Sequence, residues 1–236
     1  MILRSLLFAS VAAIFAASGA RSQTAGSCAN LQDIRLDGVE ITKASPIAAG
    51  TTLPPSRPGA PTIGPLPAHC QLEGVIHRRK GVDGEEFGIR FALALPDPAA
   101  WNHDFMMQGG GGGNGVVAYP LGASYSGDKP ALDRGFAVAS TDTGHEAKTG
   151  PFDFSFMRDQ QAFLDFAFLA NAEVAKVAKQ IISRYYSKPA AYSYFVGCST
   201  GGREGMILSQ RFPAIFNGIV SGDPAMLHRS FQPRHW

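Results

Sequence analysis

One serine of this chain lies in a glycine pattern that could make it a catalytic nucleophile. Gly197 and Gly201 flank Ser199 in the G-x-S-x-G spacing of a nucleophile elbow, a sharp strand-to-helix turn that exposes the serine hydroxyl. Glycine is needed at both flanks because side chains there would collide with the neighbouring strand and helix. An apolar, β-rich run before the pattern and a helix-compatible run after it favour this interpretation. The alternative is a glycine-rich strand-to-helix connection in which Ser199 only caps the helix.

Two backbone N–H groups are candidates for stabilising an oxyanion during attack by such a serine. The N–H of Thr200 would lie at a helix N-terminus, where it can stabilise developing negative charge. A run of five glycines at residues 109–113 follows a predicted strand. In α/β-hydrolases the loop at this place supplies the second oxyanion donor, and glycine lets its backbone approach the substrate closely. We predict Gly111, give or take one residue, as this donor, and the alternative is a flexible surface turn.

An acid and a histidine are harder to find. Asp142 and His145 follow a buried strand, at the end of a sheet where open sheets bind ligands. A polar turn in which Asp142 holds backbone amides is the favoured interpretation. A catalytic pair is disfavoured because the triad of α/β-hydrolases runs serine, acid, histidine along the chain.

Four titratable residues after Ser199 could be considered for these roles, namely Glu204, Asp223, His228 and His235. Asp223 comes one strand too early to be the acid and is predicted to be a turn residue. The two histidines lie in a polar tail beyond the last predicted strand. The sequence therefore identifies a nucleophile without identifying its base.

The pattern of apolar residues predicts the elements that must position this serine. We expect a strand at residues 33–42 with a break at Gly38, a hairpin of 72–79 and 87–95, and short strands at 105–108, 135–140, 192–196 and 219–221. We expect one long helix at 158–186, whose apolar stripe holds Val174, Val177, Ile181 and Tyr185. The proline-rich residues 44–67 should form an irregular surface crossing. Strands that alternate with helices predict an α/β fold with a parallel sheet covered on both faces.

Several stretches resemble the tannase and feruloyl esterase family. They are Gly197-Cys198-Ser199-Thr200-Gly201-Gly202-Arg203, Trp101-Asn102, Thr141-Asp142-Thr143-Gly144-His145 and Tyr194-Phe195-Val196-Gly197. The cysteine directly before the serine is the most specific element, and the resemblance extends from about residue 28 to about 225. It implies an α/β-hydrolase fold and a secreted serine carboxylic-ester hydrolase that acts on small esters of aromatic acids. No cofactor is expected in this chain, since the calcium site of the family would lie in its lid domain.

The resemblance also pairs two of the three cysteines, Cys28 with Cys70. In the family, the cysteine at the position of Cys198 bonds to a cysteine that directly follows the catalytic histidine, and this sequence has no such cysteine. Family members are longer, with a lid and then the acid and the histidine after the strand at 219–221. We therefore expect residues 21–236 to be the N-terminal portion of an α/β-hydrolase domain, truncated after about the sixth core strand.

A chain of this kind would lack the lid and the C-terminal strands, so little or no esterase activity is expected from it alone. Two alternatives remain open. One is a non-catalytic product that at best binds aromatic ligands, and the other is a module that binds partners through exposed sheet edges.

Composition and the N-terminus bound the class of protein. The chain is 45% hydrophobic and 17% charged, with a net charge of +2 and no long basic run. Neither nucleic acid nor an anionic membrane surface is thus an expected partner, and the oligomeric state is not determined. Residues 1–20 have a basic Arg4, an apolar stretch at 6–17 and small residues at 18–20, which predicts a signal peptide. No later segment is long enough to span a membrane, so a secreted or periplasmic location is expected.

Overall fold

The computed structural model describes residues 27–55, 62–123, 125 and 127–226. The predicted signal peptide, His228 and His235 lie outside the described residues. Among the helices of the described part, none is both long and apolar enough to cross a membrane.

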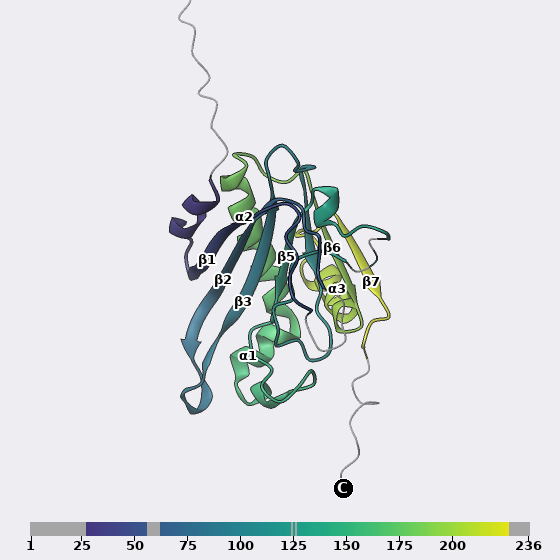
Figure 1. The fold of residues 1–236 in the computed structure, drawn as a ribbon. Helices are drawn as coiled ribbons and strands as arrows, with labels where there is room; N and C mark the ends of the chain where they lie inside the picture. Colours follow the sequence, from purple (N-terminus) through teal and green to yellow (C-terminus); the bar gives the residue numbers. More distant parts are fainter. Residues whose placement is uncertain (1–26, 56–61, 124, 126, 227–236) are drawn as a thin grey trace, which may run out of the picture.

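Seven strands of the described residues form one sheet in the order β1-β2-β3-β5-β4-β6-β7. Their bounds are β1 Val39–Ile47, β2 His69–Lys80, β3 Glu86–Pro96, β4 Asp104–Gln108, β5 Ala137–Thr141, β6 Tyr192–Cys198 and β7 Gly218–Gly222. The pairs β1–β2, β2–β3 and β3–β5 are antiparallel, whereas β5, β4, β6 and β7 are mutually parallel. Figure 1 shows the sheet running from β1 on the left to β7 on the right. Each strand predicted from residue 72 onward is confirmed, with ends that differ by a few residues.

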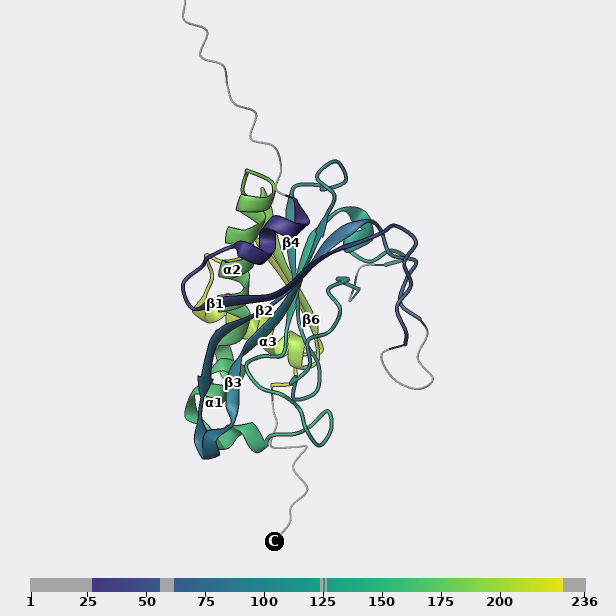
Figure 2. The ribbon, with the colours of Figure 1, turned by 60° about the vertical axis from the view of Figure 1, so that its left-hand side comes forward.

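Helices pack against this sheet. Their bounds are α1 Gln160–Leu164, α2 Ala170–Tyr185 and α3 Thr200–Arg211, with short 3-10 helices η1 Cys28–Asp33, η2 Val82–Gly84, η3 Leu132–Arg134 and η4 Ser155–Arg158. Helix α2 contacts β3, β4 and β5, and α3 contacts β6 and β7. Figure 2 shows η1 close to β1 and α2, both of which it contacts.

The long helix predicted at residues 158–186 is confirmed from Gln160 to Tyr185, but it is not α-helical throughout. A π-helical turn, Asp165–Leu169, separates α1 from α2. The side chain of Arg203 donates hydrogen bonds of 3.1 and 3.2 Å to the carbonyls of Phe166 and Ala167 within this turn. A π turn widens the helix and shifts its backbone hydrogen bonds. A long-range contact therefore accompanies this change of helix type, which the local sequence pattern does not predict.

The N-terminal prediction is also corrected. Residues 28–33 form η1, and the strand begins only at Val39, after a turn at Gly38 whose φ is 66°. The strand then continues through Pro46, which pairs with Cys70. Proline is tolerated there because β1 is an edge strand whose outer N–H groups need no partner. The expected irregular crossing is confirmed for residues 48–55 and 62–67, the described part of the segment after Ile47.

The main core lies between the sheet and α2. The predicted stripe of Val174, Val177, Ile181 and Tyr185 is buried. It packs in one cluster with fully buried sheet residues, among them Phe91, Leu93, Phe105 and Phe195. This packing fixes the parallel strands whose ends carry the candidate site.

The expected disulfide is present. Cys28 and Cys70 are bonded and link η1 to β2, and Cys198 is the free cysteine of the described residues. The bond joins positions 42 residues apart and so restricts the unfolded chain strongly.

We expect the double variant Cys28→Ser/Cys70→Ser to lose about 2–4 kcal/mol of the free energy of unfolding, because it removes this restriction. Urea denaturation of the two proteins measures the loss. Cys198→Ser is the control and should change the free energy little. Alkylation without reduction should modify the Cys198 peptide, and modification of Cys28 or Cys70 in the folded protein would contradict the assignment.

Candidate active site

Ser199 is the single residue between β6 and α3. Its backbone has φ 58° and ψ −115°, a conformation that L-residues rarely adopt and that persists only where the surrounding structure imposes it. The residue is exposed, although Gly197 and Thr200 beside it are buried. Its side chain makes no capping hydrogen bond to α3. Ser199 therefore occupies the N-cap position of α3, but within the described residues its hydroxyl does not cap the helix.

Three backbone hydrogen bonds hold Ser199 in this conformation. Its N–H donates to the carbonyl of Gly222 at 3.0 Å, and its carbonyl accepts from the N–H groups of Ala225 and Arg203, both at 3.0 Å. Gly222 ends β7, and Ala225 follows it. The strand after the elbow thus supports the strained residue.

The glycines of the pattern are required by close approach, as predicted. A Cβ on Gly197 would lie 2.5 Å from the carbonyl oxygen of Gly201, and a Cβ on Gly201 would lie 2.9 Å from that of Gly110. Gly202 is equally constrained, since its Cβ would lie 2.2 Å from the oxygen of Gly222. These contacts involve backbone atoms, which cannot rotate away as a flexible side chain can.

The glycine loop, residues 109–114, lies directly against the elbow. The N–H of Gly201 donates to the carbonyl of Gly110 at 3.0 Å, and the hydroxyl of Thr200 donates to the carbonyl of Gly112. Gly111 is exposed, and a Cβ added to it would have no atom within 4 Å. In the described part of the chain, no group accepts a hydrogen bond from its N–H.

The two predicted donors, Gly111 and Thr200, therefore belong to two segments, the glycine loop and the start of α3, that are hydrogen-bonded to each other. Thr200 is the first residue of α3, and the first N–H groups of a helix have no partner within it. Within the described residues, Gly111 and Thr200 thus each have an N–H without an acceptor, on two segments that contact each other beside the elbow.

Glu204 is a site residue whose role the sequence reasoning missed. It lies on α3 and is buried, with Oε2 accepting from the N–H of Gly110 at 3.1 Å and Oε1 accepting from the side-chain amide of Asn114. Burial raises the pKa of this carboxyl. One signal in the sequence could have indicated this role. Glu204 is a charged residue among the glycines of α3, on the side of the helix that must face the sheet.

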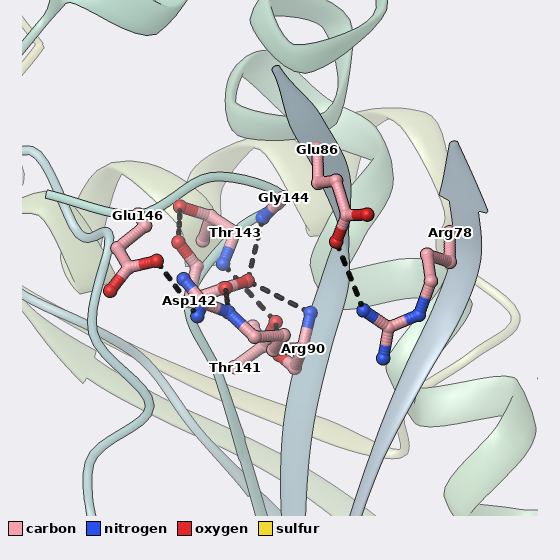
Figure 3. Close-up of polar contacts among 8 residues, drawn as sticks. All are labelled: Arg78, Glu86, Arg90, Thr141, Asp142, Thr143, Gly144 and Glu146. Atoms are coloured by element: carbon pink, nitrogen blue, oxygen red, sulfur yellow. Dashed lines mark hydrogen bonds and ion pairs between the residues drawn. The ribbon is translucent and has the colours of Figure 1, made fainter. Parts of the chain in front are cut away.

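Asp142 forms the polar turn that the sequence predicts. Its carboxylate accepts from the N–H groups of Arg90 and Gly144 at 3.0 and 2.9 Å, and from Nε of Arg90 at 2.6 Å. Figure 3 shows these contacts, with Arg90 also reaching Glu146. Burial raises the pKa of Asp142 to about 6, against the opposing effect of Arg90. The turn fastens the end of β5 to β3.

His145 is not positioned as a base for Ser199. Its ring stacks on Phe156 with centroids 3.5 Å apart, and burial lowers its pKa to about 4. Among the described residues, no histidine hydrogen-bonds to Ser199 or to Asp142. Asp223 lies just after β7 with φ 39°, in the turn position expected for it.

A cavity of about 190 Å³ adjoins the glycine loop. It is lined by Gly109, Gly110 and Gly111 of the loop and by residues that include Val116, Ala118 and Pro151. It therefore lies beside the segment that contains Gly111. In the described part of the chain, no group of three or more His, Cys, Asp or Glu side chains could hold a metal ion.

Comparison with known proteins gives consistent matches. The family model "Tannase and feruloyl esterase" matches residues 70–236. The chain is 40% identical to mono(2-hydroxyethyl) terephthalate hydrolase of Piscinibacter sakaiensis, over 71% of this chain and 28% of that protein. It is 31% identical to a probable feruloyl esterase of Arthroderma benhamiae, over 86% of this chain and 37% of that protein. The crystal structure of feruloyl esterase B from Aspergillus oryzae superposes with a TM-score of 0.66 at 27% identity, over 84% of this chain and 37% of that one. The chain thus spans about a third of the length of these relatives.

Proposed function

Because the chain belongs to the tannase and feruloyl esterase family, we propose that it carries the nucleophile of a secreted serine hydrolase that cleaves esters of aromatic acids. The α/β-hydrolase fold expected from the sequence is confirmed by the sheet and by the likeness to solved esterases. The observation that carries the proposal is the exposed Ser199, held at φ 58° between β6 and α3 without a capping role.

The proposed reaction has two steps. Oγ of Ser199 attacks the ester carbonyl carbon while a base takes its proton, and the carbonyl oxygen becomes an oxyanion. The N–H groups of Thr200 and Gly111 stabilise that charge. Collapse of the intermediate expels the alcohol, which takes the proton from the base. Water then attacks the acyl-enzyme in the same way and releases the acid. A histidine base and an acid that orients it complete such a triad, and neither is assigned among the described residues.

The substrate class rests on two supports. Relatives are named for the hydrolysis of mono(2-hydroxyethyl) terephthalate and of feruloyl esters, which share an aromatic acid. The cavity beside the glycine loop is lined in part by Val116, Ala118 and Pro151, whose apolar surfaces suit an aromatic ring. Secretion is supported by the predicted signal peptide and by the Cys28–Cys70 bond, since disulfides persist mainly in oxidising compartments.

The test uses the complete gene product and three aromatic esters: methyl ferulate, methyl gallate and mono(2-hydroxyethyl) terephthalate. Release of the free acid is followed by liquid chromatography, with methyl octanoate as the aliphatic comparison. We expect at least one aromatic ester to be hydrolysed with a higher kcat/KM than the aliphatic one. Preference for methyl octanoate would overturn the substrate class, and hydrolysis of none of the four would overturn the proposed activity.

The role of the Gly111 N–H can be tested separately. Gly111→Pro removes the N–H, and we expect kcat to fall about 10²–10³-fold, as for other lost oxyanion donors. Gly111→Ala is the matched control, because it keeps the N–H and its Cβ meets no atom within 4 Å. The kcat of both variants is measured on the best aromatic ester, with thermal denaturation to verify folding. Equal kcat for the two variants would show that another group donates.

A further inference from the structure

The buried carboxylate of Glu204 joins the elbow helix to both ends of the glycine loop. We propose that Glu204 is a positioning residue, which fixes the direction of the Gly111 N–H relative to Ser199. This inference rests on the function proposed above, because it assigns a purpose to the loop geometry in ester hydrolysis. It concerns a side chain that does not touch the substrate.

The first support is the way in which Gly110 is held. Its N–H donates to Oε2 of Glu204 at 3.1 Å, and its carbonyl accepts from the N–H of Gly201 at 3.0 Å. Both bonds come from α3, so the peptide groups on either side of Gly110 are fixed to that helix. The carbonyl of Gly110 and the N–H of Gly111 belong to one planar peptide unit. Fixing the first therefore fixes the direction of the second.

The second support is at the far end of the loop. Oε1 of Glu204 accepts from the side-chain amide of Asn114, whose own N–H donates to the carbonyl of Gly111 at 2.9 Å. Asn114 has φ 54°, a left-handed conformation that asparagine tolerates better than most residues. One carboxylate thus closes the loop at Gly110 and at Asn114, with Gly111 between them.

The third support is the cost of placing a carboxylate here. Glu204 is 3% exposed, and burial raises the pKa of its carboxyl. Hydrogen bonds from Gly110, Asn114 and Asn171 and the charge of Arg203 oppose this shift. Arg203 itself donates to the carbonyls of Phe166 and Ala167. Buried ionic groups are weak contributors to stability compared with apolar side chains of similar volume. A carboxylate that accepts from both ends of a loop is better explained by the geometry that it imposes.

The structure also supplies a conservative variant. Oδ1 of Asn114 is buried and has no hydrogen-bond partner within the described residues. In Glu204→Gln, the new amide oxygen can accept from the N–H of Gly110. Its NH₂ group can donate to Oδ1 of Asn114 after the asparagine amide rotates. Glutamine can therefore retain both links, whereas methionine, of similar size, retains neither.

The experiment compares Glu204→Met, Glu204→Gln and the control Glu173→Gln, which alters an exposed ion pair with Lys176 on α2. In the complete gene product, we expect Glu204→Met to lower kcat about 10²-fold, the scale of a misplaced oxyanion donor, with KM changed less than about threefold. Glu204→Gln should restore kcat to within about fivefold of the native value. Hydrogen–deuterium exchange should accelerate in the peptide that covers residues 109–114 of Glu204→Met.

Unchanged kcat in Glu204→Met, or an equal loss in Glu204→Gln, would overturn the proposal. If Glu204→Met does not fold, Asn114→Gly decides instead, because it removes the second link and tolerates the positive φ. A kcat at least about tenfold lower in that variant, as expected for a partly released donor, supports the proposal, and an unchanged kcat overturns it.

If the native protein hydrolyses no ester, the proposed function fails. Hydrogen–deuterium exchange of residues 109–114 in Glu204→Met then decides whether Glu204 orders the loop. An exchange rate equal to that of the native protein overturns that role.

Discussion

We expect Ser199→Ala to abolish ester hydrolysis by the complete gene product, with kcat lowered about 10⁴–10⁶-fold. The variant has no Oγ to form the acyl-enzyme, and losing the nucleophile of a hydrolytic triad has effects of this size. The KM for an aromatic ester should change little, because the donors at Thr200 and Gly111 and the cavity beside the loop remain. Initial rates on the best aromatic ester, measured at enzyme concentrations high enough to detect the residual rate, give the ratio.

Ser209→Ala is the matched control. Ser209 lies on the same helix, is exposed, and donates to the carbonyl of Met206 at 2.7 Å, so its loss should leave kcat and KM within about twofold, as for other surface changes. Thermal denaturation should show that Ser199→Ala is folded. A Ser199→Ala protein that keeps more than about a tenth of the native kcat would contradict the assignment of the nucleophile.

Gly197→Ala should be among the most destabilising single substitutions, with an expected loss of about 3 kcal/mol in the free energy of unfolding. The added methyl would lie 2.5 Å from the carbonyl oxygen of Gly201 and 2.7 Å from its Cα. Relief would require β6 and α3 to move apart, and this would break the bond between Gly201 and Gly110 in the process. Urea denaturation followed by circular dichroism measures the free energy.

The comparison for this substitution is again Gly111→Ala, where the same methyl group enters open space. It should change the free energy of unfolding by less than about 1 kcal/mol, since it creates no overlap. A loss of similar size in both variants would contradict the explanation by close approach, because a methyl group at residue 111 meets no atom within 4 Å.

The elbow could be predicted from the sequence because its determinants are local. The spacing of Gly197, Ser199 and Gly201, together with the apolar run before it and the helix-compatible run after it, predicts a strand-to-helix turn, and the structure has β6 and α3 there. Apolar runs of strand length were enough to predict the strands from residue 72 onward. Most residues of β2, β3 and β5 are buried, as expected for strands covered on both faces. The turn at Asp142 was likewise readable from residues close together in the chain.

The remaining features depend on contacts between distant parts of the chain. Glu204 bonds to Gly110 across 94 positions, and nothing in the local sequence shows that this carboxylate will meet a loop. The π turn before α2 coincides with the side chain of Arg203, which also comes from another element. The first strand was misplaced because a 3-10 helix and an edge strand containing Pro46 resemble irregular structure in a local pattern.

The backbone hydrogen bonds of Ser199 have a consequence for folding while the chain is being synthesised. Its N–H is held by Gly222, and its carbonyl by Ala225, both of which are synthesised after the whole nucleophile motif. A nascent chain that ends at α3 has the serine and its glycines but lacks the partners that impose the unusual φ. Because rare backbone conformations persist only under such constraint, the reactive geometry forms only once β7 has paired with β6. Before that pairing, Ser199 would be an ordinary residue of a flexible turn, so the pairing of β7 with β6 would create the unusual backbone of the elbow.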